Sequence, residues 1–184
     1  MAAKNEKGFT LWFTGLPCAG KSTLAGLVGD EFKARGVAYE LLDGDLVRQV
    51  LCKGLGFTKE DRDENIRRIG FICALLSRHG VAAIAAAISP YRALRDEVRS
   101  SVRNFVEVYV KAPLQLCVSR DVKGHYRRAL AGELKNFTGV NDPYEPPLNP
   151  EVLVDTEMES ADACVRKILG QLEALGLIPR SEQQ

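Results

Sequence analysis

Short apolar runs alternate along this chain with longer segments whose apolar residues recur at helical spacing. Five apolar runs predict strands, over 9–13, 38–42, 81–88, 105–110 and 152–154. The periodic segments predict helices over 21–35, 61–78, 90–102 and 160–175. Because strands that alternate with helices form crossover units, this order predicts an α/β fold with a mostly parallel five-stranded sheet and helices on both faces.

Polar segments follow four of the predicted strands. They are 15–22, 43–45, 89–92 and the segment after Val110. Ligands of open α/β sheets bind beyond the carboxyl ends of the strands. We therefore expect these segments to converge on one crevice. The sequence contains no internal repeat and no sign of a second domain, so we expect one domain over 1–184.

The segment after the first strand matches the phosphate-binding pattern G-x-x-x-x-G-K-[ST], as Gly15-Leu16-Pro17-Cys18-Ala19-Gly20-Lys21-Ser22. Its glycines let successive N–H groups point at phosphate oxygens, and the helix that follows adds its positive end. In this motif the lysine reaches the β- and γ-phosphates and the hydroxyl ligates Mg²⁺. A chance glycine-rich turn would lack the strand and helix on either side. The loop therefore predicts a nucleoside triphosphate bound with Mg²⁺.

Two carboxylates, Asp43 and Asp45, flank a glycine at the end of the second predicted strand. Such a pair suits Mg²⁺ placement or activation of a hydroxyl, although Asp-Gly-Asp is also a common turn. A helix that started there would put Asp45 and Arg48 on one face. Arg62 and Asn65 likewise extend the apolar stripe of the helix 61–78 into its first turn, towards the expected crevice.

The residues around Ser89 have two interpretations. Ser89-Pro90 alone accounts for the end of a strand and the start of a helix. Alternatively, Ser89 and Arg92 lie beside the transferred phosphoryl group. The spacing fits both.

Residues 121–150 interrupt the pattern, and we call them the lid segment. They carry the basic residues Lys123, His125, Arg127, Arg128 and Lys135, then a proline-rich stretch, and show no clear apolar face. A loop of this length in a compact domain is usually functional or disordered. Because phosphoryl transfer requires that water be excluded, we expect a lid that closes over phosphates.

Composition limits the choice of partners. The 25 basic and 24 acidic residues leave a net charge of +1, so we expect no nucleic-acid or membrane partner and a small anionic substrate instead. The polar N-terminus and the shortness of the longest apolar stretch, 81–88, predict a cytoplasmic protein. The five scattered cysteines are then expected to be reduced and mostly buried, while Cys18 could alternatively make activity sensitive to oxidation.

Together, these motifs resemble the adenylylsulfate kinase (APS kinase) family of P-loop NTPases, which phosphorylate the ribose 3′-hydroxyl of adenosine phosphosulfate. The similarity extends from about Gly8 to about Leu175. Beyond the phosphate loop it rests on the blocks 42–48, 56–57, 61–70, 88–92, 120–124, 137–139 and 142–146. Many NTPases share the phosphate loop, whereas the later blocks are typical of this family.

The resemblance implies ATP and Mg²⁺ as cofactors and assigns a donor side and an acceptor side. The donor side would comprise Gly15, Leu16, Pro17, Cys18, Ala19, Gly20, Lys21, Ser22, Thr23 and Arg120, with Ser22 and Asp43 at the metal. Substrate would contact Asp43, Asp45, Arg48, Phe57, Arg62, Asn65, Ile88, Ser89, Lys123 and Phe137.

Individual roles also follow from the resemblance. Asp45 would accept the proton of the ribose hydroxyl, and Lys21 and Lys123 would stabilise charge during transfer. Arg48, Arg62 and Asn65 would hold the phosphosulfate, and the rings of Phe57 and Phe137 would enclose the adenine. Ser89 matches a serine described in the family as a phosphoserine intermediate. Direct in-line transfer needs only positioning and charge neutralisation, and Ser89 would then support the substrate.

Two departures from the family are local. Pro17 and Cys18 stand where many members have Ser and Gly, and Asn141 replaces a common aspartate. The first two positions contribute mainly backbone, so we expect nucleotide binding to be retained.

The resemblance further implies a homodimer and a separate ATP sulfurylase that supplies the substrate. Two alternatives stay open. One is a P-loop kinase for another small hydroxylated metabolite or nucleotide. The other is a silent nucleotide-binding module, which would bind nucleotide without turnover.

Overall fold

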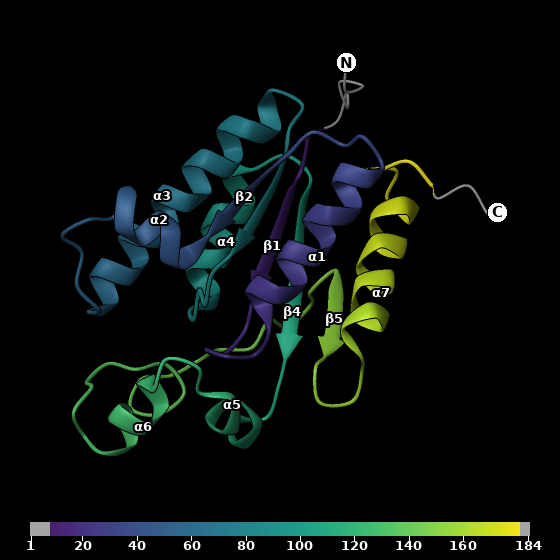
Figure 1. Cartoon of the computed structure of the whole chain (residues 1–184). Helices are drawn as coiled ribbons and strands as arrows, with labels where there is room; N and C mark the ends of the chain where they lie inside the picture. Colours follow the sequence, from purple (N-terminus) through teal and green to yellow (C-terminus); the bar gives the residue numbers. More distant parts are fainter. Residues whose placement is uncertain (1–7, 181–184) are drawn as a thin grey trace.

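Five strands form one sheet whose pairings are all parallel (Figure 1). The computed structural model describes residues 8–180, without the side chain of Asp45. The strands are β1 (Thr10–Thr14), β2 (Tyr39–Asp43), β3 (Ala82–Ala86), β4 (Phe105–Lys111) and β5 (Val152–Asp155), in the order β2-β3-β1-β4-β5. The predicted fold class and parallel sheet are confirmed.

The long helices lie where the periodicity predicts them. They are α1 (Lys21–Ala34), α3 (Lys59–Arg78), α4 (Arg92–Ser101) and α7 (Ala161–Ala174). Helix α3 begins two residues before the expected start because Thr58 caps it, its Oγ1 accepting a hydrogen bond from the N–H of Asp61 at 3.2 Å.

Three short helices were not predicted as elements. They are α2 (Gly44–Val50), α5 (Leu114–Arg120) and α6 (His125–Leu130), and each has seven residues or fewer. Such lengths are too short to show a repeating apolar stripe. The expectation that the lid segment has no apolar face was wrong, because α6 lies within it and buries Tyr126 and Ala129.

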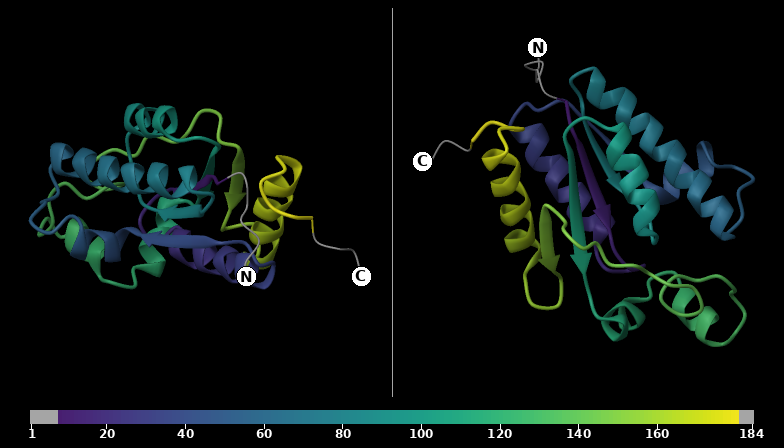
Figure 2. Two further views of the ribbon diagram at one scale, coloured as in Figure 1. Left: turned by 90° about the horizontal axis from the view of Figure 1, so that it is seen from above. Right: turned by 180° about the vertical axis from the view of Figure 1, so that it is seen from behind.

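The sheet separates two apolar layers (Figure 2). Side chains alternate across β1, so that Leu11 and Phe13 pack with α1 and α7 while Trp12 packs with α3 and α4. Helices therefore cover both faces, as predicted. No helix between residues 8 and 180 combines the length and apolar character needed to cross a membrane.

Candidate functional site

The phosphate-binding loop leaves the carboxyl end of β1 and leads directly into α1. Gly15 has a φ of +152°, and a Cβ there would lie 2.4 Å from the carbonyl oxygen of Val110, so only glycine fits. The Lys21 ammonium lies across the loop and donates to the carbonyl oxygens of Gly15 at 2.9 Å and Leu16 at 2.7 Å. The loop thus holds its lysine in place.

A serine and a carboxylate meet beside this loop. Ser22 Oγ donates to Asp43 Oδ2 at 2.7 Å, and Asp43 Oδ1 accepts from the N–H of Leu46 at 3.4 Å. Both are hard oxygen donors of the kind Mg²⁺ prefers, and Mg²⁺ commonly keeps several waters beside one or two protein ligands. The pair therefore fits a magnesium ion. Asp45 is in the first turn of α2, and its side chain is outside the described part of the chain.

Arg120 contacts the loop from α5. Its guanidinium donates to Thr156 Oγ1 at 3.1 Å and to the Thr156 carbonyl at 2.9 Å, and it lies 3.4 Å from the carbonyl oxygen of Ala19. Thr156 Oγ1 itself donates to Ala19 O at 3.0 Å. The sequence analysis did not identify Thr156, although its position just after β5 could have indicated it.

On the other side of the crevice, Arg48 lies over an exposed aromatic ring. Its guanidinium carbon is 4.3 Å from the centroid of Phe57, and it donates to the carbonyls of Leu55 and Gly56. The Phe57 residue is 57% exposed. An exposed ring beside a cation can take a flat, anionic ligand.

Arg62 joins the start of α3 to the lid segment. Its Nη1 donates to Thr138 Oγ1 at 2.5 Å and to Asp142 Oδ2 at 2.6 Å, and its Nε donates to the carbonyl of Phe57 at 3.1 Å. Tyr91 OH also donates to Asp142, at 3.1 Å. This carboxylate is thus shared by α3 and the residue before α4.

Asn65 follows Arg62 by one helical turn. It is buried, and its Oδ1 has no hydrogen-bond partner among residues 8–180. Because buried polar atoms are nearly always bonded, an open one beside a crevice is a candidate for contact with a ligand or water.

The Ser89 hydroxyl is buried, with only 2% of the residue exposed. Its Oγ accepts a hydrogen bond from Trp12 Nε1 at 3.0 Å and lies 3.1 Å from Thr14 Oγ1. Its φ of +40° is in the left-handed region, which is strained for serine. The neighbouring Ile88 carbonyl accepts from Thr14 Oγ1 at 2.8 Å. These bonds favour a supporting function for Ser89 over that of a nucleophile.

The lid segment packs onto the phosphate loop. Tyr126 is fully buried, and its OH donates to the carbonyl of Pro17 at 3.1 Å. Burial raises the pKa of this phenol. The Phe137 ring contacts Tyr126 edge-on, with centroids 4.9 Å apart. A Cβ on Gly139, which has a φ of +91°, would lie 2.9 Å from Leu16 Cδ2.

Lys123 is exposed in the turn between α5 and α6. Asp121 fixes this turn, because its carboxylate accepts from the N–H groups of Tyr126 at 3.0 Å and Arg127 at 2.9 Å. Burial alone would raise the pKa of Asp121, but these bonds hold it below its ordinary value. The lysine is thereby presented from an ordered turn.

The two sides lie at one edge of the sheet (Figure 1). Contacts join the phosphate loop to Asp43, to the end of β3 through Thr14, and to α5 and the lid segment. The four polar segments expected to converge therefore do so. The individual functions of the site residues stay predictions.

The profile of the family described as adenylylsulphate kinase matches residues 7–155. The chain is 57% identical over 173 residues to an adenylyl-sulfate kinase of Gloeothece citriformis, covering 94% of this chain and 98% of that one. It is also similar to a solved structure of the Mycobacterium tuberculosis APS kinase CysC in complex with AMPPNP and APS. The TM-score is 0.86 with 39% identity, covering 91% of this chain and 98% of that one.

Two further relatives differ in assembly. A probable bifunctional SAT/APS kinase 2 of Sorangium cellulosum is 56% identical, over 94% of this chain and 30% of that protein. A hexameric APS kinase from Thiobacillus denitrificans has a TM-score of 0.74 and 35% identity, over 97% of this chain and 31% of that one.

Proposed function

Because this chain belongs to the adenylylsulphate kinase family, we propose that it transfers the γ-phosphoryl group of ATP to the ribose 3′-hydroxyl of adenylyl sulfate. The products are ADP and 3′-phosphoadenylyl sulfate, the activated form used in sulfate assimilation. The observation that carries the proposal is the meeting of the Ser22–Asp43 pair with Arg62 and Asn65 at one edge of the sheet.

The donor side binds the triphosphate. Backbone N–H groups of residues 15–20 and the N-terminus of α1 offer donors to phosphate oxygens. Lys21 exchanges its present bonds to loop carbonyls for the β- and γ-phosphates. Arg120 and Thr156 hold the loop at Ala19, so that it needs little rearrangement on binding.

Ser22 and Asp43 would hold the magnesium ion, with waters and phosphate oxygens in its other positions. The bound ion neutralises charge that develops on the transferred group. Thr23 follows on the exposed face of the first turn of α1 and belongs to the same phosphate side.

The acceptor side orients adenylyl sulfate. Arg48, Arg62 and Asn65 bind its phosphosulfate, and Phe57 and Phe137 enclose its adenine. The exposed Phe57 ring and the open Asn65 oxygen support this assignment. Asp45, in the first turn of α2 directly after Asp43, accepts a hydrogen bond from the 3′-hydroxyl and takes its proton.

The lid segment excludes water and delivers Lys123 to the transferring group. Its contacts with the phosphate loop through Tyr126 and with α3 through Asp142 support this motion as one that couples both sides. Transfer is direct and in line, with Ser89 and Ile88 supporting the substrate. The buried, bonded state of the Ser89 hydroxyl supports this assignment over a phosphoserine intermediate.

The test is an ADP-release assay with ATP and a panel of acceptors. The panel contains adenylyl sulfate, nucleosides, sugars and small hydroxylated metabolites. We expect turnover with adenylyl sulfate and little with the others. Preferred turnover of another acceptor would establish a kinase of different specificity, and nucleotide binding without turnover would establish a silent module.

We also propose a homodimer formed by an apolar patch on α2 and α3. Exposed apolar side chains follow one another at helical spacing, Leu46 and Val50 on α2 and Phe71 and Leu75 on α3, with Leu51 between them. A second copy would cover this patch. Light scattering should give twice the chain mass, and Phe71→Glu should give monomers. Leu148→Glu, at an exposed apolar residue off the patch, is the matched control. A hexamer would contradict the dimer.

The proposed setting is the cytoplasm, where the five free cysteines stay reduced and an ATP sulfurylase, as a separate chain, supplies adenylyl sulfate. Co-purification with a sulfurylase activity would test this partnership.

A further inference from the structure

We propose that Arg95, on the buried face of α4, is a positioning residue for the acceptor side. It holds Ser89 and residues 144–146, which we call the lid stem, at the end of β3. This inference rests on the proposed function of the site and adds a residue that does not touch the substrate.

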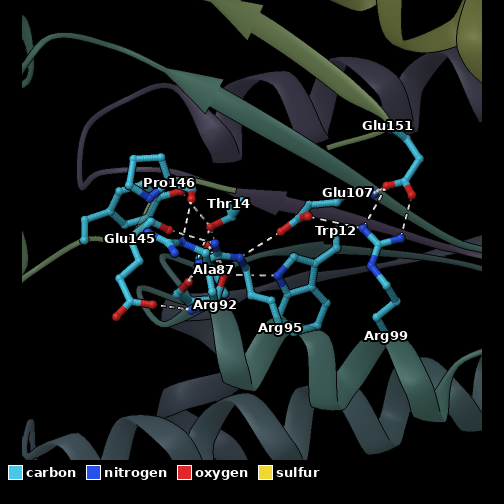
Figure 3. Close-up of polar contacts among 12 residues, drawn as sticks. Trp12, Thr14, Ala87, Arg92, Arg95, Arg99, Glu107, Glu145, Pro146 and Glu151 are labelled. Atoms are coloured by element: carbon cyan, nitrogen blue, oxygen red, sulfur yellow. Dashed lines mark hydrogen bonds and ion pairs between the residues drawn. The ribbon is translucent and has the colours of Figure 1, made fainter. Parts of the chain in front are cut away.

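All three guanidinium nitrogens of Arg95 are bonded to different parts of the chain (Figure 3). Nε donates to Glu107 Oε1 on β4 at 2.8 Å, Nη1 donates to the Ser89 carbonyl at 2.6 Å, and Nη2 donates to the Glu145 carbonyl at 2.7 Å. The side chain is 2% exposed. One residue thus joins the sheet, the end of β3 and the lid stem.

Glu107 gives Arg95 its fixed place. It pairs with Trp12 across β4 and β1, and faces the α3 and α4 layer, where an apolar residue would be expected. A carboxylate that is 8% exposed is costly unless it is paired and hydrogen-bonded. Arg95 supplies that pairing, and the geometry of both side chains is thereby constrained.

A second pair extends the same network. Arg99 Nη2 donates to Glu107 Oε2 at 3.2 Å, and Arg99 donates to both oxygens of Glu151, at 2.5 and 3.0 Å (Figure 3). Glu151 Oε2 also accepts from the N–H of Glu107 at 2.6 Å. Two cations and two carboxylates balance, and they fix the chain just before β5. Arg99 contacts neither Ser89 nor the lid stem in any printed bond of the described chain.

The lid stem is bonded to the residues after β3 on several sides. The Glu145 N–H donates to the Pro90 carbonyl at 2.9 Å, and Glu145 Oε2 accepts from the Arg92 N–H at 2.8 Å. Arg92 Nε donates to the Pro146 carbonyl at 3.0 Å, and Tyr144 OH lies 3.0 Å from Thr14 Oγ1. The stem is therefore an anchored end from which the rest of the lid segment extends.

This anchoring has a consequence for the acceptor side. Asp142, two residues before the stem, receives Arg62, and Ser89 keeps a left-handed backbone while its carbonyl accepts from Arg95. Loss of the Arg95 bonds would let Ser89 relax and would shift Asp142 and Arg62 with the stem. The phosphate loop is held by Arg120, Thr156 and Tyr126 instead, so ATP binding should change little.

The chain contains its own reporter of this geometry. Trp12 is the single tryptophan, it is fully buried, and its Nε1 donates to Ser89 Oγ. A shift of Ser89 therefore changes the environment of the indole N–H, and the emission maximum of Trp12 should report it. A substitution that only lowers stability leaves this emission unchanged in the folded protein.

The experiment compares Arg95→Lys with Arg99→Lys by steady-state kinetics, thermal unfolding and Trp12 emission. For Arg95→Lys we expect the KM for adenylyl sulfate to rise about tenfold or more, since a misplacement on the order of 1 Å can cost about a hundredfold. The KM for ATP should stay within about twofold, and the emission maximum should move. Arg99→Lys should change neither KM by more than about twofold.

A double variant separates positioning from stability. Arg95→Met with Glu107→Gln removes both buried charges, so it should fold even if Arg95→Lys does not. Positioning predicts that its KM for adenylyl sulfate stays raised and its emission stays shifted. Recovery of the wild-type KM with wild-type emission would overturn the proposal, as would equal rises in both KM values for Arg95→Lys. If the wild-type protein does not use adenylyl sulfate, the proposed function fails, while an unshifted Trp12 emission in both variants would still overturn positioning on its own.

Discussion

The donor side of the site is formed by consecutive residues, 15–22, whereas the acceptor side is assembled from α2, α3, the end of β3 and the lid segment. The loop keeps its shape through its own backbone and a few bonds to its carbonyls. The acceptor side depends on bonds between residues that are far apart in sequence, such as Arg62 with Asp142 and Arg95 with Glu145.

This difference predicts different responses to substitution. A change in the donor side removes a direct phosphate contact and should reduce turnover sharply. A change in the acceptor side loosens one of several contacts and should raise the KM for adenylyl sulfate in proportion. The predictions below begin with the largest effect.

Lys21→Ala should reduce turnover by roughly a thousandfold or more, because a charge contact to the transferring group is lost. Steady-state ADP release measures it. Lys33→Ala, at an exposed lysine in the last turn of the same helix, is the matched control and should keep normal turnover. Near-normal turnover of Lys21→Ala would remove the basis for the donor side.

Arg62→Ala should raise the KM for adenylyl sulfate about 10- to 100-fold, since hydrogen bonds to charged groups contribute about 1.5–3 kcal/mol. The KM for ATP should stay within about twofold. Arg67→Ala is the control on the same helix, because Arg67 bonds the exposed Glu97 instead. If both KM values rose equally, the two sides would not be separable.

Ser89→Ala should keep activity within about tenfold of wild type if transfer is direct. It should also lower the free energy of unfolding by about 1–3 kcal/mol, because Trp12 Nε1 loses its buried partner. Kinetics and denaturant unfolding measure the two effects. Complete loss of activity with intact adenylyl sulfate binding would favour the phosphoserine route.

The smallest effect concerns two thiols, one behind each side. Burial raises the pKa of Cys73, in α3, from 9.0 to about 12, and it raises that of Cys117, in α5, by an amount too small to carry a value. A raised thiol pKa stabilises the fold below pH 9 and loses that contribution as the pH rises towards 12. The free energy of unfolding should therefore fall by roughly 1–3 kcal/mol by about pH 11.

Cys73→Ala should flatten this alkaline loss more than Cys117→Ala does, when unfolding is followed from pH 8 to about pH 11. An equal effect of the two variants would show that the layer behind the acceptor side is not the more strongly desolvated one.

Much of this architecture could be predicted from residue patterns. The phosphate loop and the strands are local signals, because their residues are contiguous. The short helices α2, α5 and α6 carry no periodic stripe, and the bonds of Arg95 join segments that only the folded chain brings together. One signal was available, since the alternation along β4 places Glu107 on an inward face where it requires a cation.

The most direct test of the two-sided site is transfer of labelled phosphoryl. The protein is incubated with γ-labelled ATP, Mg²⁺ and adenylyl sulfate, and the product and the protein are analysed by mass spectrometry and ³¹P NMR. We predict label on the ribose 3′-oxygen of adenylyl sulfate and none on the protein. Label that appears only in free phosphate, or on any other acceptor atom, would contradict the account.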